Sequence, residues 1–251
     1  LQESELQRLA LNKGFSLPDN PRFVSRLSNL FYFGEYLNNY DDIDRKGNYR
    51  DFTDKLWLKK ICGSLRKDGM DAQRDRYMIE IAKRRVDSGC FYVDTADLRQ
   101  NVLFALCQDE LLGFDVSRNE YFISHDIYEE WALNKIVDRS WRKNREVPAF
   151  FSAIGDSLPI RRAFRMWLSD ELMECNGDIP QIIPDAFKDS TLSKFWKDEI
   201  IVACLLSKYA DRFFSLFDKE IKANNFAIFR RALFLLRTAC VVPNKFFQQL
   251  M

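Results

Sequence analysis

Histidine is almost absent from this chain: His125 is the only one among 251 residues. The six cysteines are scattered, and no two of them form a Cys-x-x-Cys pair. Because a structural zinc site usually draws four Cys or His ligands from closely spaced pairs, the sequence predicts no metal site. Most of the cysteines lie among apolar residues, and we expect them to be reduced thiols that pack like small hydrophobic side chains.

Long apolar runs are missing too. No stretch approaches the roughly 18 consecutive apolar residues of a transmembrane helix, and no charged-then-apolar signal peptide opens the chain. We therefore expect a cytoplasmic protein that makes no contact with a membrane. An amphipathic helical pattern is already running at Leu1, without an initiating Met, which indicates a fragment of a larger protein.

An excess of charge of one sign is the third absence. The 38 basic residues are balanced by 37 acidic ones, so nothing draws the whole chain towards nucleic acid or anionic lipid. What the chain does have is 47% hydrophobic and 30% charged residues. This is the composition of a folded globular protein.

Apolar residues recur at helical spacing along most of the chain, which predicts a mainly α-helical fold. The first segment, 1–68, reads as a helical lid with helices over 1–12, 22–37 and 52–61. An Asn-Pro turn precedes the second helix, and the polar stretch 38–48 follows it as a loop.

The middle segment, 69–145, has a different order of elements. The pattern predicts a helix over 71–88, a strand over 90–93, helices over 95–102 and 103–112, a hairpin at 114–123 and a helix over 126–141. Helices followed by a small hairpin in this order are typical of a winged helix, a variant of the helix-turn-helix group. We therefore expect a winged-helix domain here.

The last segment, 146–251, reads as consecutive amphipathic helices. They are predicted over 149–156, 159–174, 179–188, 192–209, 212–222, 227–239 and 243–250. Helices that follow one another with aromatic faces indicate a solenoid of stacked helical repeats, cut inside the array. An apolar face left open by such a cut could support self-association.

One motif resembles a known family. The sequence YFISHDIYEEWA, from Tyr121 to Ala132, resembles the end of the winged-helix domain in STAND-type signalling ATPases, the group that includes NB-ARC and NACHT proteins. There a wing strand leads into a His-Asp pair and then a helix. His125 and Asp126 stand at these two positions, and Ser124 stands where the family has Met.

A second stretch carries the same resemblance. Residues 26–33, RLSNLFYF, look like the helical lid that follows the ATPase core in this family, with Leu30 where a proline is often found. The resemblance implies a nucleotide-controlled switch, in which ADP holds a closed monomer and ATP-bound subunits oligomerise. His125 and Asp126 would then sense the nucleotide, and the helical repeats would sense a ligand, which we expect to be a protein. Many bacterial members act in defence against phage.

The chain contains no Gly-x-x-x-x-Gly-Lys-Ser/Thr loop, so it has nothing to cradle the phosphates of ATP. We expect no catalysis and no cofactor in this fragment, and a missing nucleotide-binding domain upstream of Leu1 that would bind ATP or ADP. A Gly-x-Ser-x-Gly nucleophile motif is also absent. No residue is therefore assigned a catalytic role.

Each candidate site residue also has a structural interpretation. His125 could simply cap the following helix or pack on Trp131, and Asp126 could be an N-cap. Arg84 and Arg85 could contact a phosphate or the missing domain, or could form an ordinary solvated face near a helix C-terminus. The sequence leaves both interpretations open.

Two other functions are alternatives to a STAND-like regulatory fragment. A winged helix can bind DNA with a helical domain for dimerisation, but residues 94–120 carry six acidic and two basic residues, which phosphate would repel. Nucleic acid is therefore not the partner we expect. A plain helical scaffold is the third interpretation, and a phosphate-binding loop upstream of Leu1 would separate the first interpretation from the other two.

Overall fold

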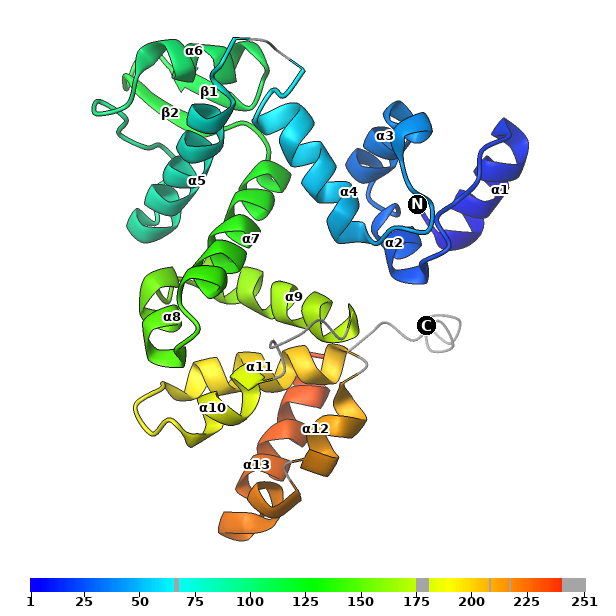
Figure 1. The fold of residues 1–251 in the computed structure, drawn as a ribbon, viewed down its shortest axis with the longest axis vertical. Helices are drawn as coiled ribbons and strands as arrows, with labels where there is room; N and C mark the ends of the chain where they lie inside the picture. Colours follow the sequence, from blue (N-terminus) through cyan, green and yellow to red (C-terminus); the bar gives the residue numbers. More distant parts are fainter. Residues whose placement is uncertain (66–67, 175–180, 208, 217, 241–251) are drawn as a thin grey trace. The chain divides into compact units, whose positions relative to one another are not determined.

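A computed structural model of the chain describes residues 1–65, 68–174, 181–207, 209–216 and 218–240. These residues are mainly α-helical, with one two-stranded antiparallel sheet (Figure 1). The mainly helical fold class predicted from periodicity is confirmed. Cys175 and the helix predicted over 243–250 lie outside the described residues.

The chain divides into two compact units. Unit 1 is Leu1–Tyr77 with Leu98–Leu111, and unit 2 is Met78–Asp97 with Leu112–Met251. The division does not follow the three segments 1–68, 69–145 and 146–251, which stay a prediction. Helix α5 (Asp71–Ser88) begins in unit 1 and ends in unit 2.

Unit 1 is built from short helices. These are α1 (Glu3–Lys13), α2 (Pro21–Arg26), α3 (Leu30–Asn38), the 3-10 turn η1 (Tyr40–Asp42), α4 (Tyr49–Leu56), the π-helical turn η2 (Trp57–Ile61), the start of α5 and α6 (Gln100–Gln108). The single helix predicted over 22–37 was wrong, because the chain breaks after α2. The Asn29 side chain accepts the Phe31 N–H and starts α3 afresh, as an N-cap residue does.

Aromatic rings form the core of the first half of unit 1. Phe23 packs on Phe52 with ring centroids 4.9 Å apart and edge-on against Tyr36 at 5.9 Å. The Tyr36 hydroxyl donates to the Ser16 carbonyl oxygen at 2.7 Å, and burial raises the pKa of Tyr36 to about 12. A buried tyrosine in this position needs that partner for its hydroxyl.

A buried arginine holds the second half of unit 1 together. Arg74 of α5 is 0% exposed. Its Nε donates to the Ile61 carbonyl oxygen at 2.8 Å, and its Nη2 donates to the Lys60 carbonyl oxygen at 3.0 Å and to Asp109 Oδ2 at 2.7 Å. The guanidinium thus satisfies carbonyls of the π-helical turn and links that turn to the end of α6.

Unit 2 continues with the end of α5 and a hairpin of β1 (Leu112–Asp115) and β2 (Glu120–Ile123). The helices that follow are α7 (Asp126–Lys143), α8 (Val147–Ile154), α9 (Leu158–Glu174), α10 (Ile182–Lys188), α11 (Lys194–Leu206), α12 (Ala210–Leu216) and α13 (Asp218–Thr238). Helix α9 packs against α7 and α11, and α11 packs against α13. The predicted hairpin and the α5 stop at Gly89, whose φ is 67°, are confirmed.

Two predicted elements between α5 and the hairpin were wrong. The strand expected over 90–93 is a single bridge between Val93 and Tyr121, and residues 95–99 of the helix expected over 95–102 are not helical, since α6 begins only at Gln100. Asp94 accepts the Ala96 N–H in a tight turn, a local bond by which Asp competes with helix formation.

Gly113 leaves room for an aromatic ring across the hairpin. It stands opposite Phe122 in the register, and a Cβ built on Gly113 would lie only 2.6 Å from both Cε atoms of that ring. The Phe122 ring in turn stacks on Phe91 at 5.2 Å.

Replacing Gly113 with Val should therefore push the Phe122 ring off the strand. Overpacking of this kind costs about 1–3 kcal/mol, although Val itself suits a strand. Urea unfolding of Gly113→Val and of the double variant Gly113→Val/Phe122→Ala would measure it. The double variant should recover much of the loss, and a Gly113→Val protein as stable as the parent would contradict the expected clash.

Candidate functional site

His125 lies between β2 and α7, in the backbone position of a helix N-cap. Its φ is −144° and ψ is 134°, and its Nδ1 accepts the Ile127 N–H at 3.1 Å. Because Nδ1 is used as an acceptor, the proton of the neutral ring is on Nε2, which makes Nε2 a donor. The side chain is exposed. Capping of α7, one of the two roles considered for His125, is thus observed.

A pocket of about 490 Å³ opens beside the N-terminus of α7. Its charged lining residues are Asp126, Glu129 and Glu130 of α7 and Arg162 of α9. Apolar side chains from the same two helices form the rest of the wall, Leu133 among them. Asp126 and Glu129 also lie in the first turn of α7, where negative charge is favoured by the helix dipole. The N-cap role considered for Asp126 was wrong, because His125 occupies that position.

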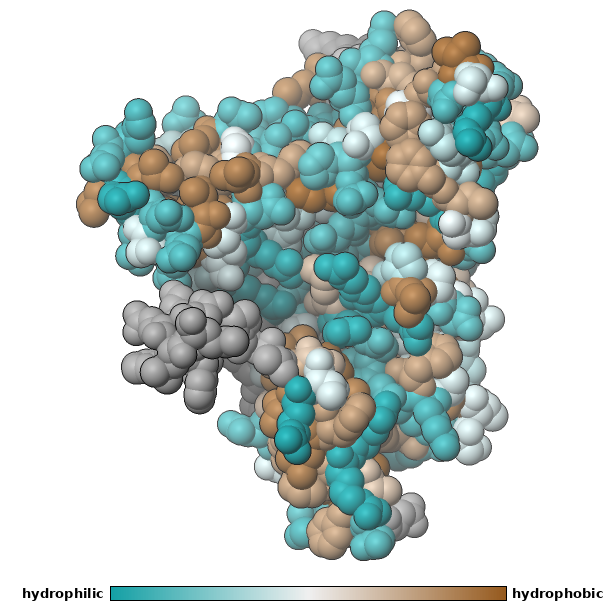
Figure 2. All heavy atoms as spheres, turned by 180° about the vertical axis from the view of Figure 1, so that it is seen from behind, coloured by the Kyte–Doolittle hydropathy of each residue, from teal (hydrophilic) through white to brown (hydrophobic). Residues whose placement is uncertain are grey.

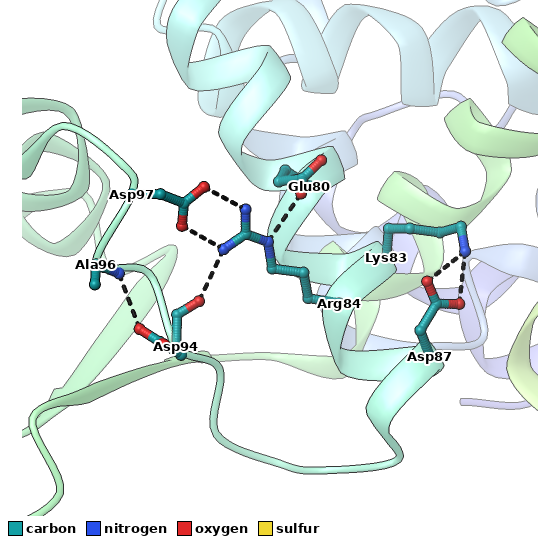
Figure 3. A network of polar contacts seen from close by, with 7 residues as sticks. All are labelled: Glu80, Lys83, Arg84, Asp87, Asp94, Ala96 and Asp97. Atoms are coloured by element: carbon teal, nitrogen blue, oxygen red, sulfur yellow. Dashed lines mark hydrogen bonds and ion pairs between the residues drawn. The ribbon is translucent and has the colours of Figure 1, made fainter.

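Arg84 is engaged within unit 2 by a network of polar contacts (Figure 3). Its two Nη atoms each donate to a carboxylate oxygen of Asp97 at 2.6 Å, and its Nε donates to Glu80 at 2.8 Å. Nη1 also donates to the Asp94 carbonyl oxygen at 3.0 Å. The network fastens the turn at 94–97 to α5, so a phosphate would have to compete with two carboxylates for this guanidinium.

The pKa of Asp97 reports on this pair. Hydrogen bonds from Arg84 lower it from 3.8 to about 2. A carboxyl group with a lowered folded pKa stabilises the fold above its unfolded pKa, and that contribution is lost as the pH falls from about 4 to about 2. The turn at 94–97 should therefore loosen in that window of pH.

We expect an NMR titration of the Asp97 carboxyl carbon to give a midpoint near 2, and the Arg84→Gln variant to return it towards 3.8. Asp115 is a control, because Ser117 rather than Arg84 lowers the pKa of that carboxyl group. A midpoint for Asp97 that does not move in Arg84→Gln would show that the ion pair is absent in solution.

Arg85 points to a different neighbour from Arg84. Its Nη1 lies 3.3 Å from Glu129 Oε2 on α7, and its guanidinium covers the Phe91 ring at 4.9 Å. The distance makes an ion pair, but Nη1 forms no hydrogen bond of good geometry there. Burial raises the pKa of Glu129, and the nearby Arg85 charge opposes that shift.

The four predicted site residues are thus divided between two places. Arg85 reaches α7 through Glu129, which lines the pocket together with Asp126, whereas Arg84 is turned to the 94–97 segment. The sequence had not singled out Glu129 or Asp97. Each pairs with an arginine that is distant in the sequence, so no spacing rule could have identified it.

No model of a known protein family matches this chain, and no curated protein matches it either. Within the described ranges, no group of three or more His, Cys, Asp or Glu side chains could hold a metal ion. None of the helices that the structure describes is both long and apolar enough to cross a membrane.

Proposed function

We propose that this chain is a regulatory and interaction part of a STAND-like signalling ATPase. It would couple the nucleotide state of a neighbouring domain to ligand sensing and oligomerisation. The observation that carries the proposal is the geometry of His125, which follows a strand, precedes a helix and has its ring proton on Nε2. A donor at a helix N-terminus suits an anionic phosphate oxygen.

The surroundings of His125 fit a role in coupling. Asp126, the next residue, lines the pocket with Glu129, and Glu129 pairs with Arg85 of α5. A movement of the junction at His125 would therefore be transmitted to α5 through Glu129 and Arg85.

Nucleotide binding and any ATP hydrolysis would take place in other parts of the protein. ATP or ADP would be held by a nucleotide-binding domain upstream of Leu1, and this chain would have no catalytic residue. The helical segment would sense a protein ligand, and the resemblance suggests bacterial antiphage defence as the setting. A DNA-binding winged helix and a plain helical scaffold are the alternatives, and neither would require a phosphate-binding loop upstream.

Replacement of His125 separates its two roles. His125→Ala removes both the cap and the imidazole, while His125→Ser keeps a capping oxygen but is too short to replace the ring. We expect both variants to lose about 1.5–3 kcal/mol of ADP binding free energy, the usual worth of a hydrogen bond to a charged group. Only His125→Ala should also lose about 0.5–2 kcal/mol of stability.

Calorimetric titration of ADP into the full-length protein, and thermal unfolding of the same samples, would make both measurements. If His125→Ser binds ADP as the parent does, His125 is only a helix cap. If the full-length protein has no phosphate-binding loop upstream of Leu1, the proposal is wrong.

A further inference from the structure

Two residues within the last helix depart from regular helical geometry. Within α13, Asn225 and Phe226 have φ values of 55° and 59°, which are left-handed and unusual for side chains of this kind. Regular helical geometry therefore resumes after Phe226 and continues to Thr238. In this segment Ala232 and Leu235 are buried.

A half-exposed ion pair lies beside the buried face of this segment. Arg231 donates to both carboxylate oxygens of Asp198 on α11, at 2.8 and 2.6 Å, and α11 packs against α13. The buried Ala232 and Leu235 side chains and this ion pair together orient the helix about its own axis.

The opposite flank of the same helix exposes a second apolar stripe, which we call the outer stripe: Phe229, Leu233 and Leu236. Their exposed fractions are 38%, 43% and 45%. Spacings of four and three residues place these side chains in one row along the helix, as in the ridges that pack one helix against another. Figure 2 shows hydrophobic side chains exposed among hydrophilic ones at the end of unit 2 where α12 and α13 lie.

The basic residues around the outer stripe limit which kind of partner can bind there. From residue 221 to the end of the sequence there is no acidic residue, and the basic ones are Lys222, Arg230, Arg231, Arg237 and Lys245. Arg230 and Arg237 are exposed and lie beside the stripe. Like charges facing each other are unfavourable, which argues against α13 pairing with α13 of a second copy. The segment after α13 has no acidic residue to offer these arginines either.

We propose that the outer stripe is a docking site for an amphipathic α-helix of another protein, with apolar residues in a row and acidic residues on the flanks. Phe226 and Phe234 of α13 are exposed as well, by 48% and 52%, and the Arg231 guanidinium lies over the Phe234 ring at 5.0 Å. The outer stripe is the row of side chains at helical spacing against which a partner helix can pack. The acidic residues on one flank would pair with Arg230 and Arg237, which lie on the same side of the stripe. This proposal goes beyond the nucleotide switch and does not depend on it.

The test uses two synthetic peptides of about 20 residues, roughly 30 Å long as helices. Both carry Leu in a helical row, flanked by Glu in the acidic peptide and by Lys in its basic twin. Fluorescence anisotropy should show that the acidic peptide binds the protein at least about tenfold more tightly than the twin. Leu233→Asp should weaken binding of the acidic peptide about tenfold or more, while Val116→Asp, at an 83% exposed site in the hairpin, should leave it unchanged.

A charge swap gives the deciding result. The double variant Arg230→Glu/Arg237→Glu should bind the basic twin more tightly than the acidic peptide, which a loss of folding cannot produce. Equal affinity for the two peptides, or no binding of either, would overturn the proposal. Vesicles of equal parts phosphatidylcholine and phosphatidylserine test the membrane alternative by sedimentation. If the protein does not discriminate between the peptides but sediments with the vesicles, and Leu233→Asp abolishes this sedimentation, the stripe binds a membrane surface instead.

Discussion

Replacing Arg74 with Met is expected to lower the free energy of unfolding by about 3–5 kcal/mol, the usual cost of removing one member of a buried ion pair. The side chain is 0% exposed and donates to three carbonyl oxygens and to Asp109. Met fills a similar volume but donates nothing, so the Lys60 and Ile61 carbonyl oxygens would lose a partner that buried polar groups need.

Conservative changes show which property of Arg74 matters. Arg74→Lys keeps the charge but cannot reach several acceptors from one planar group, so we expect an intermediate loss of about 2 kcal/mol. A double-mutant cycle with Asp109→Asn should give a coupling energy of about 0.5–3 kcal/mol. Hydrogen exchange of 98–111 should rise in each variant, because Asp109 belongs to that segment of unit 1.

The control lies on the same helix. Arg76 is exposed, and Arg76→Met should change stability by no more than about 0.5 kcal/mol. If urea unfolding gives Arg74→Met and Arg76→Met the same stability, the buried arginine does not hold unit 1 together.

Phe164→Ala should cost about 3–5 kcal/mol in unit 2, because it removes a large aromatic ring from a packed core. Phe164 is 0% exposed, and its ring lies 5.2 Å from those of Phe151 and Trp196. These neighbours belong to α8 and α11, so one side chain of α9 joins three helices. Favourable edge-on contacts between the rings add to the loss.

Phe164→Leu is the matched partner of that variant, and it should cost less since it leaves a smaller cavity. Phe104, which is 63% exposed on α6, provides the control, and Phe104→Ala should stay within about 0.5 kcal/mol of the parent. Thermal unfolding followed by tryptophan fluorescence would rank the three. A loss for Phe164→Ala no greater than for Phe104→Ala would mean that the ring cluster is not packed in solution.

The elements that local signals define were predicted well. Helix α7 and the hairpin before it appear within a few residues of their predicted bounds, because a helical stripe and alternating apolar residues around a polar turn are both readable in the sequence. The break before Leu30 also has a local signal, because Asn29 is the N-cap of α3. The apolar spacing continues across this position, however, and therefore predicted a single helix. Bounds of elements are the part that patterns predict least well.

Contacts between distant residues were not predictable in the same way. The sequence grouped Arg84 and Arg85 as one basic patch, yet they turn to Asp97 and to Glu129 respectively. Neighbouring positions on a helix face different directions, and what each meets depends on packing. The burial of Arg74 was unforeseen for the same reason, since its acidic partner stands 35 residues away.

The sequence by itself determined that this protein is mainly helical, where a hairpin interrupts the helices, and that the chain contains no phosphate-binding loop. Periodicity and composition suffice for these conclusions because they depend on residues close together in the chain or on the inventory of residue types. Only the tertiary structure decided that Arg74 is buried, that His125 caps α7 through Nδ1, and that one flank of α13 stays exposed. Burial and pairing are properties of surfaces that meet in space, and residue spacing alone does not specify which surfaces meet.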